Sequence, residues 1–280
     1  MFTSDSAGRL GLLISVCFVF FVADALGADR LSGFLGFDRN DYPGDTNLNE
    51  LHKTFACTGY WLNNPPGAKT NTWAGKRRKL EAAGFGFLVL FNGRLYRELR
   101  SHAAELGKSD AQAAVAAARR EGFPAQTIIF LDQEEGGRLL PEQKAYLFAW
   151  VDGVSQSGFR AGVYCSGIAA QEKTGASVIT ADDIRQNAGT LPITYWVTND
   201  ACPPSPGCTV SQRPPAPSES GVAFADVWQF AQSPKRKDVA ASCKGYHADG
   251  SCYVPGGVDQ RMHLDLNAAT SFDPSHGRTR

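Results

Sequence analysis

The sequence predicts a single α/β domain of the (β/α)8, TIM-like barrel type, with short or irregular helices and two long loops. Eight short apolar runs recur along the chain, and such runs without alternation are typical of strands buried on both faces. Segments that can form helices separate most of these runs, as expected for a barrel built from βα units. The predicted strands are 34–38, 57–62, 85–91, 127–132, 160–165, 193–198, 226–230 and 262–266.

The helices between these strands follow from capping and stop signals. Ser109 and Gln112 form a capping box that predicts a helix from residue 109 to Glu121, closed by Gly122. Pro141 suits the first turn of the next helix. Two further helices are expected at 49–55 and 76–83, and a third is expected to begin at residue 180. The tail from residue 273 is expected to be unstructured. A doubly wound open sheet is the alternative fold, but no Gly-rich phosphate loop follows the first strand.

The chain divides into an expected signal peptide, residues 1–27, and a barrel domain, residues 28–280. Residues 10–22 are an apolar block preceded by Arg9, and small residues follow, so that cleavage after Ala25 or Gly27 is expected. An uncleaved anchor is the alternative, but the block is short for a span of about 20 residues. We therefore expect a protein that is secreted, periplasmic or in the cell envelope, without a stable membrane span after cleavage, and monomeric.

The cysteines agree with export. The sequence has seven, and without Cys17 six remain, an even number that suggests disulfides. Local pairing predicts Cys202–Cys208 and Cys243–Cys252, each closing a long loop, and leaves Cys57 with Cys165. Zinc is the alternative, but the sequence has no C-x-x-C pair and no close histidine pair. We expect no metal and no cofactor.

Composition argues against a nucleic-acid partner. Lys+Arg and Asp+Glu both number 28, so the formal net charge is +0. A balanced chain has no bulk attraction to nucleic acid or to an anionic membrane.

The stretch Thr127–Gly136 is the strongest candidate for chemistry. A buried apolar run leads directly into Asp132 and Glu134. Side chains alternate along a strand, so these two carboxyls point to the same side, roughly 6–7 Å apart along the backbone. Such a pair suits glycoside hydrolysis, in which one carboxyl donates a proton and a neighbour stabilises the developing positive charge. The alternative is a polar strand end that enters a solvated loop, because D-x-E is a short and common pattern.

Other strand ends add acidic, aromatic and amide side chains at the same predicted rim. In a barrel, the carboxyl ends of the strands carry the active site. Aromatic rings stack on the apolar faces of sugars, and carboxylates or amides bind the hydroxyls. Trp196 and Trp228 can instead be core residues, and Asp259 competes with Asp265 for the last acidic position. The predicted site residues are Asp38, Tyr60, Trp61, Asp132, Glu134, Tyr164, Trp196, Trp228, Gln229 and Asp265.

Six segments occur along the chain in a characteristic order: Gly36–Asp38, Asp132–Glu134, Gly162–Ser166, Tyr195–Val197, Trp228–Phe230 and Leu264–Asn267. In this order they resemble the glycoside hydrolase family 25 lysozymes and, more closely, the related exported bacterial glycoside-hydrolase-like domains, a family of unknown function. The similarity extends from about Phe34 to Arg278.

The resemblance implies a short-helix β/α barrel that cleaves the β-1,4 bond between N-acetylmuramic acid and N-acetylglucosamine in peptidoglycan. It implies that Glu134 is the general acid and that Asp132 orients the substrate's acetamido group, which acts as internal nucleophile in a substrate-assisted route. A direct or an inverting role for the carboxyls is the alternative that the resemblance leaves open. Asp38 and Asp265 would complete an acidic floor. We therefore expect a secreted hydrolase of peptidoglycan or a related N-acetylated glycan. The alternative is a barrel that binds cell-wall glycan, or serves envelope structure, without catalysis.

Overall fold

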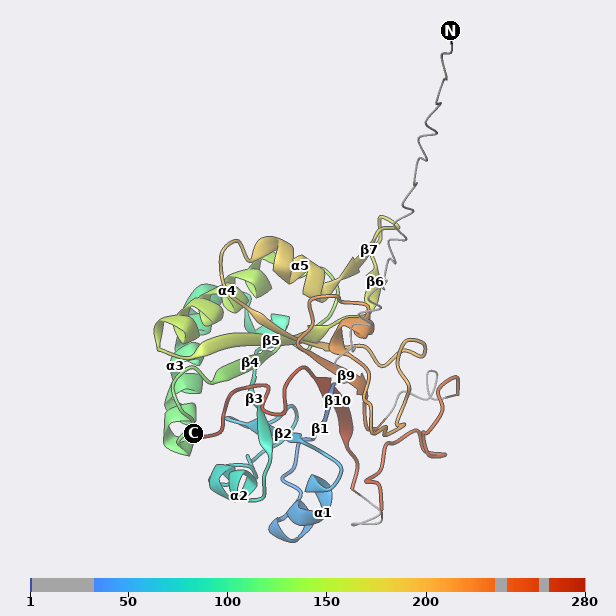
Figure 1. Cartoon of the computed structure of the whole chain (residues 1–280). Coiled ribbons are helices and arrows are strands. Elements are labelled where there is room, and N and C mark those ends of the chain that lie inside the picture. Colours follow the sequence, from blue (N-terminus) through green and yellow to red (C-terminus); the bar gives the residue numbers. More distant parts are fainter. Residues whose placement is uncertain (2–32, 235–240, 257–261, 280) are drawn as a thin grey trace.

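Eight strands close into a barrel (Figure 1), which confirms the predicted architecture and excludes the open sheet. The computed structural model describes residues 1, 33–234, 241–256 and 262–279, so the predicted signal peptide and Asp259 lie outside the described residues. Around the barrel the strands follow in the order β1 (Phe34–Asp38), β2 (Cys57–Trp61), β3 (Gly86–Asn92), β4 (Ile128–Asp132), β5 (Arg160–Ser166), β8 (Thr194–Thr198), β9 (Val227–Ala231) and β10 (Asp265–Ala269).

The barrel is mixed rather than fully parallel. Neighbouring strands from β1 to β9 run parallel, but β10 is antiparallel to both β9 and β1. The predicted eighth strand, 262–266, was placed three residues too early and in the wrong direction. Between β8 and β10 the described residues contain no α-helix, so no βα unit forces a parallel return.

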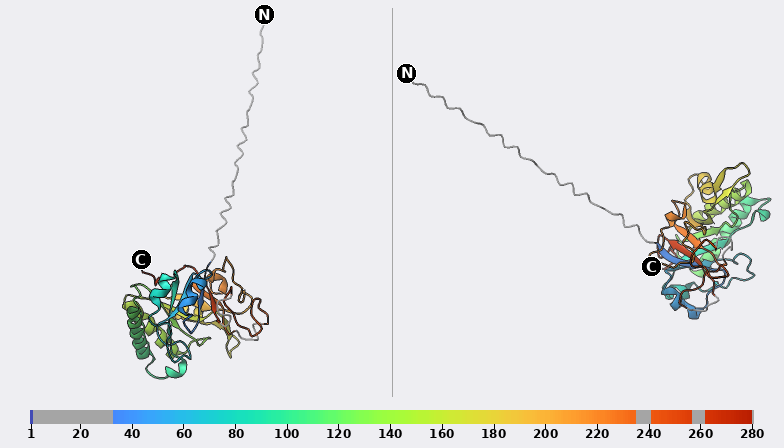
Figure 2. Two further views of the ribbon diagram at one scale, coloured as in Figure 1. Left: turned by 90° about the horizontal axis from the view of Figure 1, so that it is seen from below. Right: turned by 90° about the vertical axis from the view of Figure 1, so that its right-hand side faces the viewer.

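The helices are short except for two on one side of the barrel (Figures 1 and 2). A small hairpin, β6 (Ala169–Gln171) with β7 (Ser177–Ile179), was not predicted. The helices are α1 (Leu48–His52), α2 (Arg77–Ala82), α3 (Ala103–Glu121), α4 (Pro141–Gln156) and α5 (Thr180–Asn187).

Helix α3 begins six residues before its predicted start, so the capping box at Ser109 was wrong. Its N-cap is His102, in the left-handed conformation at φ 59°. The additional turns pack on α4: a Cβ on Gly107 would lie 2.3 Å from the backbone oxygen of Tyr146. Close helix–helix packing therefore extends α3 beyond the local capping signal.

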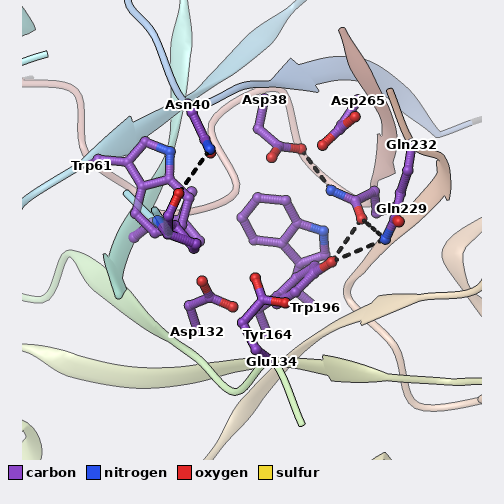
Figure 3. Close-up of a pocket in the computed structure, with 12 residues that line it drawn as sticks. Asp38, Asn40, Trp61, Asp132, Glu134, Tyr164, Trp196, Gln229, Gln232 and Asp265 are labelled. Carbon is purple, nitrogen blue, oxygen red and sulfur yellow. Dashed lines mark hydrogen bonds between the residues drawn. The ribbon is translucent and has the colours of Figure 1, made fainter. Parts of the chain in front are cut away.

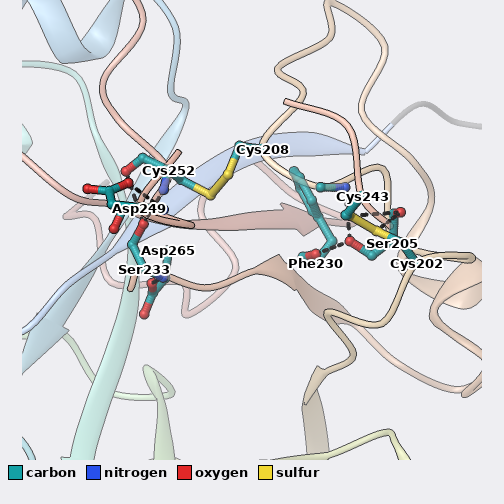
Figure 4. Close-up of a disulfide and its surroundings, with 11 residues drawn as sticks. Cys202, Ser205, Cys208, Phe230, Ser233, Cys243, Asp249, Cys252 and Asp265 are labelled. Carbon is teal, nitrogen blue, oxygen red and sulfur yellow. Dashed lines mark hydrogen bonds between the residues drawn. A yellow bond between two sulfur atoms is a disulfide. The ribbon is translucent and has the colours of Figure 1, made fainter. Parts of the chain in front are cut away.

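The disulfides differ from the local pairing predicted from the sequence. The structure pairs Cys202 with Cys243 and Cys208 with Cys252 (Figure 4). It leaves Cys57 and Cys165 as buried free thiols. Each bond crosslinks the loop after β8 to the loop after β9 instead of closing one loop on itself. Cys57 and Cys165 lie on β2 and β5, which β3 and β4 separate in the barrel.

The C-terminal tail, predicted to be unstructured, is ordered against β3 and β4. Ser275 donates its backbone N–H to Phe87 O (2.8 Å) and accepts from Ile128 N (2.7 Å), and its Oγ accepts from Val89 N (2.8 Å). Asp273 Oδ1 accepts from Phe87 N (2.9 Å). The tail thus supplies hydrogen-bond partners to buried backbone groups that the barrel leaves open. No helix among the described residues is both long and apolar enough to cross a bilayer.

We expect Ser275→Ala to lower the free energy of unfolding by about 1–3 kcal/mol, because it leaves the buried Val89 N–H without a partner. Urea denaturation measures the loss. The same substitution at Ser177, exposed in the β6–β7 hairpin, is the control and is expected to change stability by less than about 0.5 kcal/mol. Equal stability of the two variants would show that the tail does not hold the strands.

Candidate active site

A polar pocket of about 160 Å³ opens where β1 and β4 end (Figure 3). This is the rim at which barrels of this type carry their sites. Its lining residues are Asp38, Asn40, Trp61, Pro66, Leu90, Asp132, Glu134, Tyr164, Trp196, Gln229, Gln232 and Asp265.

The pocket brings together eight of the ten residues that the sequence predicted, and two lie elsewhere. Tyr60 packs on Phe87 and Phe123, and its hydroxyl donates to Glu121 of α3. The Trp228 indole N–H donates to Asn199 O (2.9 Å). Tyr60 precedes the pocket-lining Trp61, and Trp228 precedes the pocket-lining Gln229. Because side chains alternate along a strand, Tyr60 and Trp228 point to the outer face of the barrel.

Asp265 reaches the pocket by a route that the sequence did not predict. It was expected near the carboxyl end of a parallel strand, but it begins an antiparallel one. The reversal places the start of β10 beside the end of β1, where Asp265 is the register partner of Asp38. Asp265 therefore lines the pocket, although the strand direction expected for it was wrong.

Asp38 is held by a network of neutral amides. Its Oδ1 accepts from Asn267 Nδ2 (2.7 Å) and Gln229 Nε2 (3.0 Å). Gln229 Oε1 in turn accepts from the Tyr164 hydroxyl (2.7 Å) and from Gln232 Nε2 (2.9 Å). Each amide therefore has a fixed orientation, with its N–H toward the carboxyl.

The neighbouring strand β2 makes room for this carboxyl. A Cβ on Gly59 of β2 would lie 2.6 Å from the Asp38 Cβ, so only glycine fits there. Burial raises the pKa of Asp38 to about 6, against the lowering effect of the two amide hydrogen bonds and with a further rise from Glu134. Desolvation of the charged form therefore outweighs the hydrogen bonds.

Asp132 is buried without a donor. Its side chain is 3% exposed, and no N–H or hydroxyl of the described residues donates to either of its oxygens. Burial raises its pKa well above the usual range, and Glu134 and Asp38 add to the rise. The Glu134 carboxyl lies within hydrogen-bonding reach, and two carboxyls bond only when one of them holds a proton. Asp132 and Glu134 thus form a pair that favours one shared proton.

Glu134 is the accessible member of this pair. Its side chain is exposed at the mouth of the pocket, and partial desolvation raises its pKa although the bond to Asp132 opposes the rise. The backbone on either side is fixed: Gln133 N–H donates to Tyr164 O (2.9 Å), and Gly137 N–H to Thr180 Oγ1 (2.7 Å). Glu135 Oε2 accepts from Tyr96 N (2.6 Å) and Gln143 Nε2 (2.9 Å). The loop therefore anchors its other side chains and leaves Glu134 directed at the pocket.

The site is electrostatically one-sided. Among the residues that the structure describes, its lining includes four carboxyls and no lysine, arginine or histidine. Burial raises the pKa of Asp265 most strongly, and repulsion from Asp38 raises it further. The hydrogen bond from the Ser233 N–H lowers it. Among the described residues no group of three or more His, Cys, Asp or Glu side chains is arranged to hold a metal ion.

Sequence reasoning did not assign Asn40, Gln232 or Asn267 to the site. Asn267 had a signal: it lies two residues after Asp265 and so faces the same side of β10. Gln232 follows the last residue of β9, so the alternation of side chains along the strand does not predict which way its side chain points. Its place in the network depends on the fold of the loop beyond the strand.

Residues 56–213, more than half of the chain, match the family model described as the Rv2525c-like, glycoside hydrolase-like domain. The chain belongs to this family. No curated protein matches the sequence.

Three solved structures place this Rv2525c-like chain among related barrels. An uncharacterized protein from B. stearothermophilus is 22% identical, with a TM-score of 0.54, and the match covers 85% of this chain and 96% of that one. The Mycobacterium tuberculosis Tat-secreted protein Rv2525c, solved with L-tartrate, is 15% identical, with a TM-score of 0.50 and coverage of 86% and 96%. A family 25 glycosyl hydrolase from Bacillus anthracis is 11% identical, with a TM-score of 0.50 and coverage of 85% and 89%. At these identities the likeness establishes a shared fold.

We expect Asp38→Asn to stabilise the protein at neutral pH. The pKa of Asp38 is about 6 in the folded state and about 3.9 unfolded, so the folded state binds more protons between these values. Wild-type stability therefore falls as pH rises through this window, and the variant escapes this loss. Its advantage should grow by about 1–3 kcal/mol from pH 4 to pH 7 in urea denaturation.

The control is Asp45→Asn, on the surface. Hydrogen bonds from Lys79 and Tyr42 hold the pKa of Asp45 below its usual range, so its contribution is constant above about pH 5. A pH-independent difference between Asp38→Asn and wild type would contradict the raised pKa.

Proposed function

We propose that this protein is an exported glycoside hydrolase that cleaves peptidoglycan or a related N-acetylated glycan, with Glu134 as general acid and Asp132 assisting. One observation carries the proposal. Among the residues that the structure describes, no N–H or hydroxyl donates to the buried carboxyl of Asp132. This carboxyl lies beside Glu134, an exposed carboxyl of raised pKa, in a pocket that no described cationic side chain lines. A buried acceptor that the protein leaves open favours a ligand that brings the missing donor.

Glu134 has the properties of a proton donor. Its raised pKa keeps the carboxyl protonated closer to neutral pH, as a general acid requires. Its exposure lets a glycosidic oxygen approach from the mouth of the pocket. The neighbouring Asp132, to which no N–H or hydroxyl of the described residues donates, offers acceptors to the substrate.

The closeness of the two carboxyls favours substrate assistance. Direct mechanisms place the two groups about 5–5.5 Å apart for retention or about 6.5–9.5 Å apart for inversion. Asp132 and Glu134 interact directly, which favours a route in which neither carboxyl attacks the anomeric carbon. In the proposed route, Asp132 accepts the acetamido N–H and directs the acetamido oxygen at the anomeric carbon.

In the proposed mechanism, Asp38 and Asp265 act on the substrate through the electrostatic field of their carboxyls. An oxocarbenium-like transition state is cationic, and acidic groups in a desolvated pocket stabilise it. The aromatic residues differ in role. Trp196 is fully buried and packs edge-on under Tyr164 at 5.2 Å between ring centroids, so it supports the floor. Trp61 and Tyr164 offer their rings to the ligand.

Export is supported by three separate observations. The N-terminal apolar block predicts a signal peptide, disulfides form in oxidising compartments, and the related Rv2525c is a Tat-secreted protein.

A glycan-binding protein without catalysis is the second candidate, and the size of the pocket favours it. About 160 Å³ equals the liquid volume of about five water molecules, less than the ~300 Å³ at which ligand pockets usually begin. Such a pocket admits part of one sugar unit.

Zymography on peptidoglycan, with analysis of soluble products, tests the proposal. We expect wild-type protein to clear the substrate and Glu134→Gln to lose activity by about 10²- to 10⁴-fold, because it cannot donate the proton. Asp132→Asn should lose a comparable factor. The matched control is Glu105→Gln, exposed on α3 and outside the pocket lining, which should retain activity.

Clearing by Glu134→Gln would remove this residue from the mechanism. Sedimentation with peptidoglycan by wild type and Glu134→Gln alike, without any product, would establish the binding function instead.

A further inference from the structure

Ser233 connects a disulfide to an acidic residue of the pocket (Figure 4). Its backbone N–H donates to Asp265 Oδ1. Its Oγ donates to Cys252 O (3.0 Å) and accepts from Cys252 N. The Leu264 N–H donates to the same Cys252 carbonyl (3.1 Å). The Cys252 backbone therefore contacts both Leu264, which precedes Asp265, and Ser233, which donates a hydrogen bond to Asp265.

We propose that Ser233 is a positioning residue for Asp265 and that the Cys208–Cys252 disulfide holds Ser233 in place. The importance of this for catalysis rests on the proposed function, in which Asp265 contributes to the acidic floor. The disulfide fixes Cys252 to the loop after β8, and two hydrogen bonds pass this constraint to Ser233. The residue before Ser233 is Gln232, which lines the pocket and donates to Gln229 Oε1.

Asp265 needs such a donor because its other charged neighbours repel it. Asp38 at the end of β1, Asp200 after β8 and Glu134 after β4 all raise the pKa of Asp265, in addition to burial. The Ser233 N–H opposes them by stabilising the carboxylate. If Ser233 moves, the carboxylate loses this hydrogen bond while the repulsion stays.

The second disulfide offers an internal control. Cys202–Cys243 crosslinks the same two loops across 41 residues, against 44 for Cys208–Cys252. Loops of similar length should lose similar stability when they are opened. The contacts around Cys202 lead to Ser205, whose hydroxyl donates to Phe230 O on β9, and not to Asp265. Removal of either bond thus loosens the same loops, but only one bond supports Ser233.

Titration of the Asp265 carboxyl by ¹³C NMR on the full chain tests the proposal. Ser233→Ala keeps the backbone N–H but loses both bonds to Cys252, and Cys208→Ser/Cys252→Ser loses the anchor itself. We expect both variants to raise the midpoint of Asp265 by about one pH unit. Ser233→Thr, which retains the hydroxyl, should titrate as wild type. Cys202→Ser/Cys243→Ser should leave the midpoint unchanged.

An unchanged midpoint in Ser233→Ala and in the Cys208/Cys252 variant would overturn the proposal. An equal rise in the Cys202/Cys243 variant would also overturn it, because the effect would then reflect general loosening of the loops.

Peptidoglycan hydrolysis by the same variants separates this proposal from the proposed function. If wild type is active, Ser233→Ala should lower kcat more than it changes KM and should shift the pH profile, and Ser233→Thr should restore both. A raised Asp265 midpoint in a protein that hydrolyses no glycan would support the positioning role and contradict the hydrolase. Glycan hydrolysis by wild type, with an unshifted Asp265 midpoint in the variants, would support the hydrolase and contradict the positioning role.

Discussion

The antiparallel pairing of β10 with β1 is the constraint on which the rest of the site depends. It sets Asp265 beside Asp38 in register, while β4 supplies Asp132 and the loop after it supplies Glu134. Four carboxyls then share one small pocket, and no described cationic side chain in its lining relieves them. The rim offsets their repulsion with neutral groups: the amides of Gln229 and Asn267 and the backbone N–H of Ser233. These neutral donors hold the carboxyls in place without neutralising their field, which the proposed glycoside hydrolysis would use to stabilise a cationic transition state.

The parallel part of the barrel was predictable because its signal is local. A run of apolar residues buried on both faces predicts a strand whatever surrounds it, and β1 to β5, β8 and β9 lie within one residue of their predicted bounds. The direction of β10 was not predictable, because strand direction depends on the neighbouring strands and on a long connection without α-helix. Tyr60 and Trp61 show the same limit on a smaller scale. Adjacent aromatic residues look alike in the sequence, and only the register of β2 decides which one faces the pocket.

The disulfides and the tail were mispredicted for a related reason. The prediction assumed that each cysteine pairs within its own loop. The loops after β8 and β9 instead lie side by side, and both disulfides join one loop to the other. The tail carries no apolar period, yet Asp273 and Ser275 satisfy backbone groups of β3 and β4 that lie far away in sequence. Polar residues that complete a distant hydrogen-bond pattern have no periodic signature, so neither feature could be derived from residue spacing.

Comparison of the buried aspartates distinguishes structural carboxyls from those of the site. Asp110 accepts a bidentate bond from Arg94 and a third from Tyr146. Asp273 accepts three backbone N–H groups, and Asp183 accepts from Lys144 and the Leu139 N–H. Asp132, equally buried, accepts from none of the N–H or hydroxyl groups that the structure describes. Because the same chain satisfies every other one of these carboxyls, the open acceptors of Asp132 are a property of the pocket rather than of the fold, and they are the feature on which the proposed function rests.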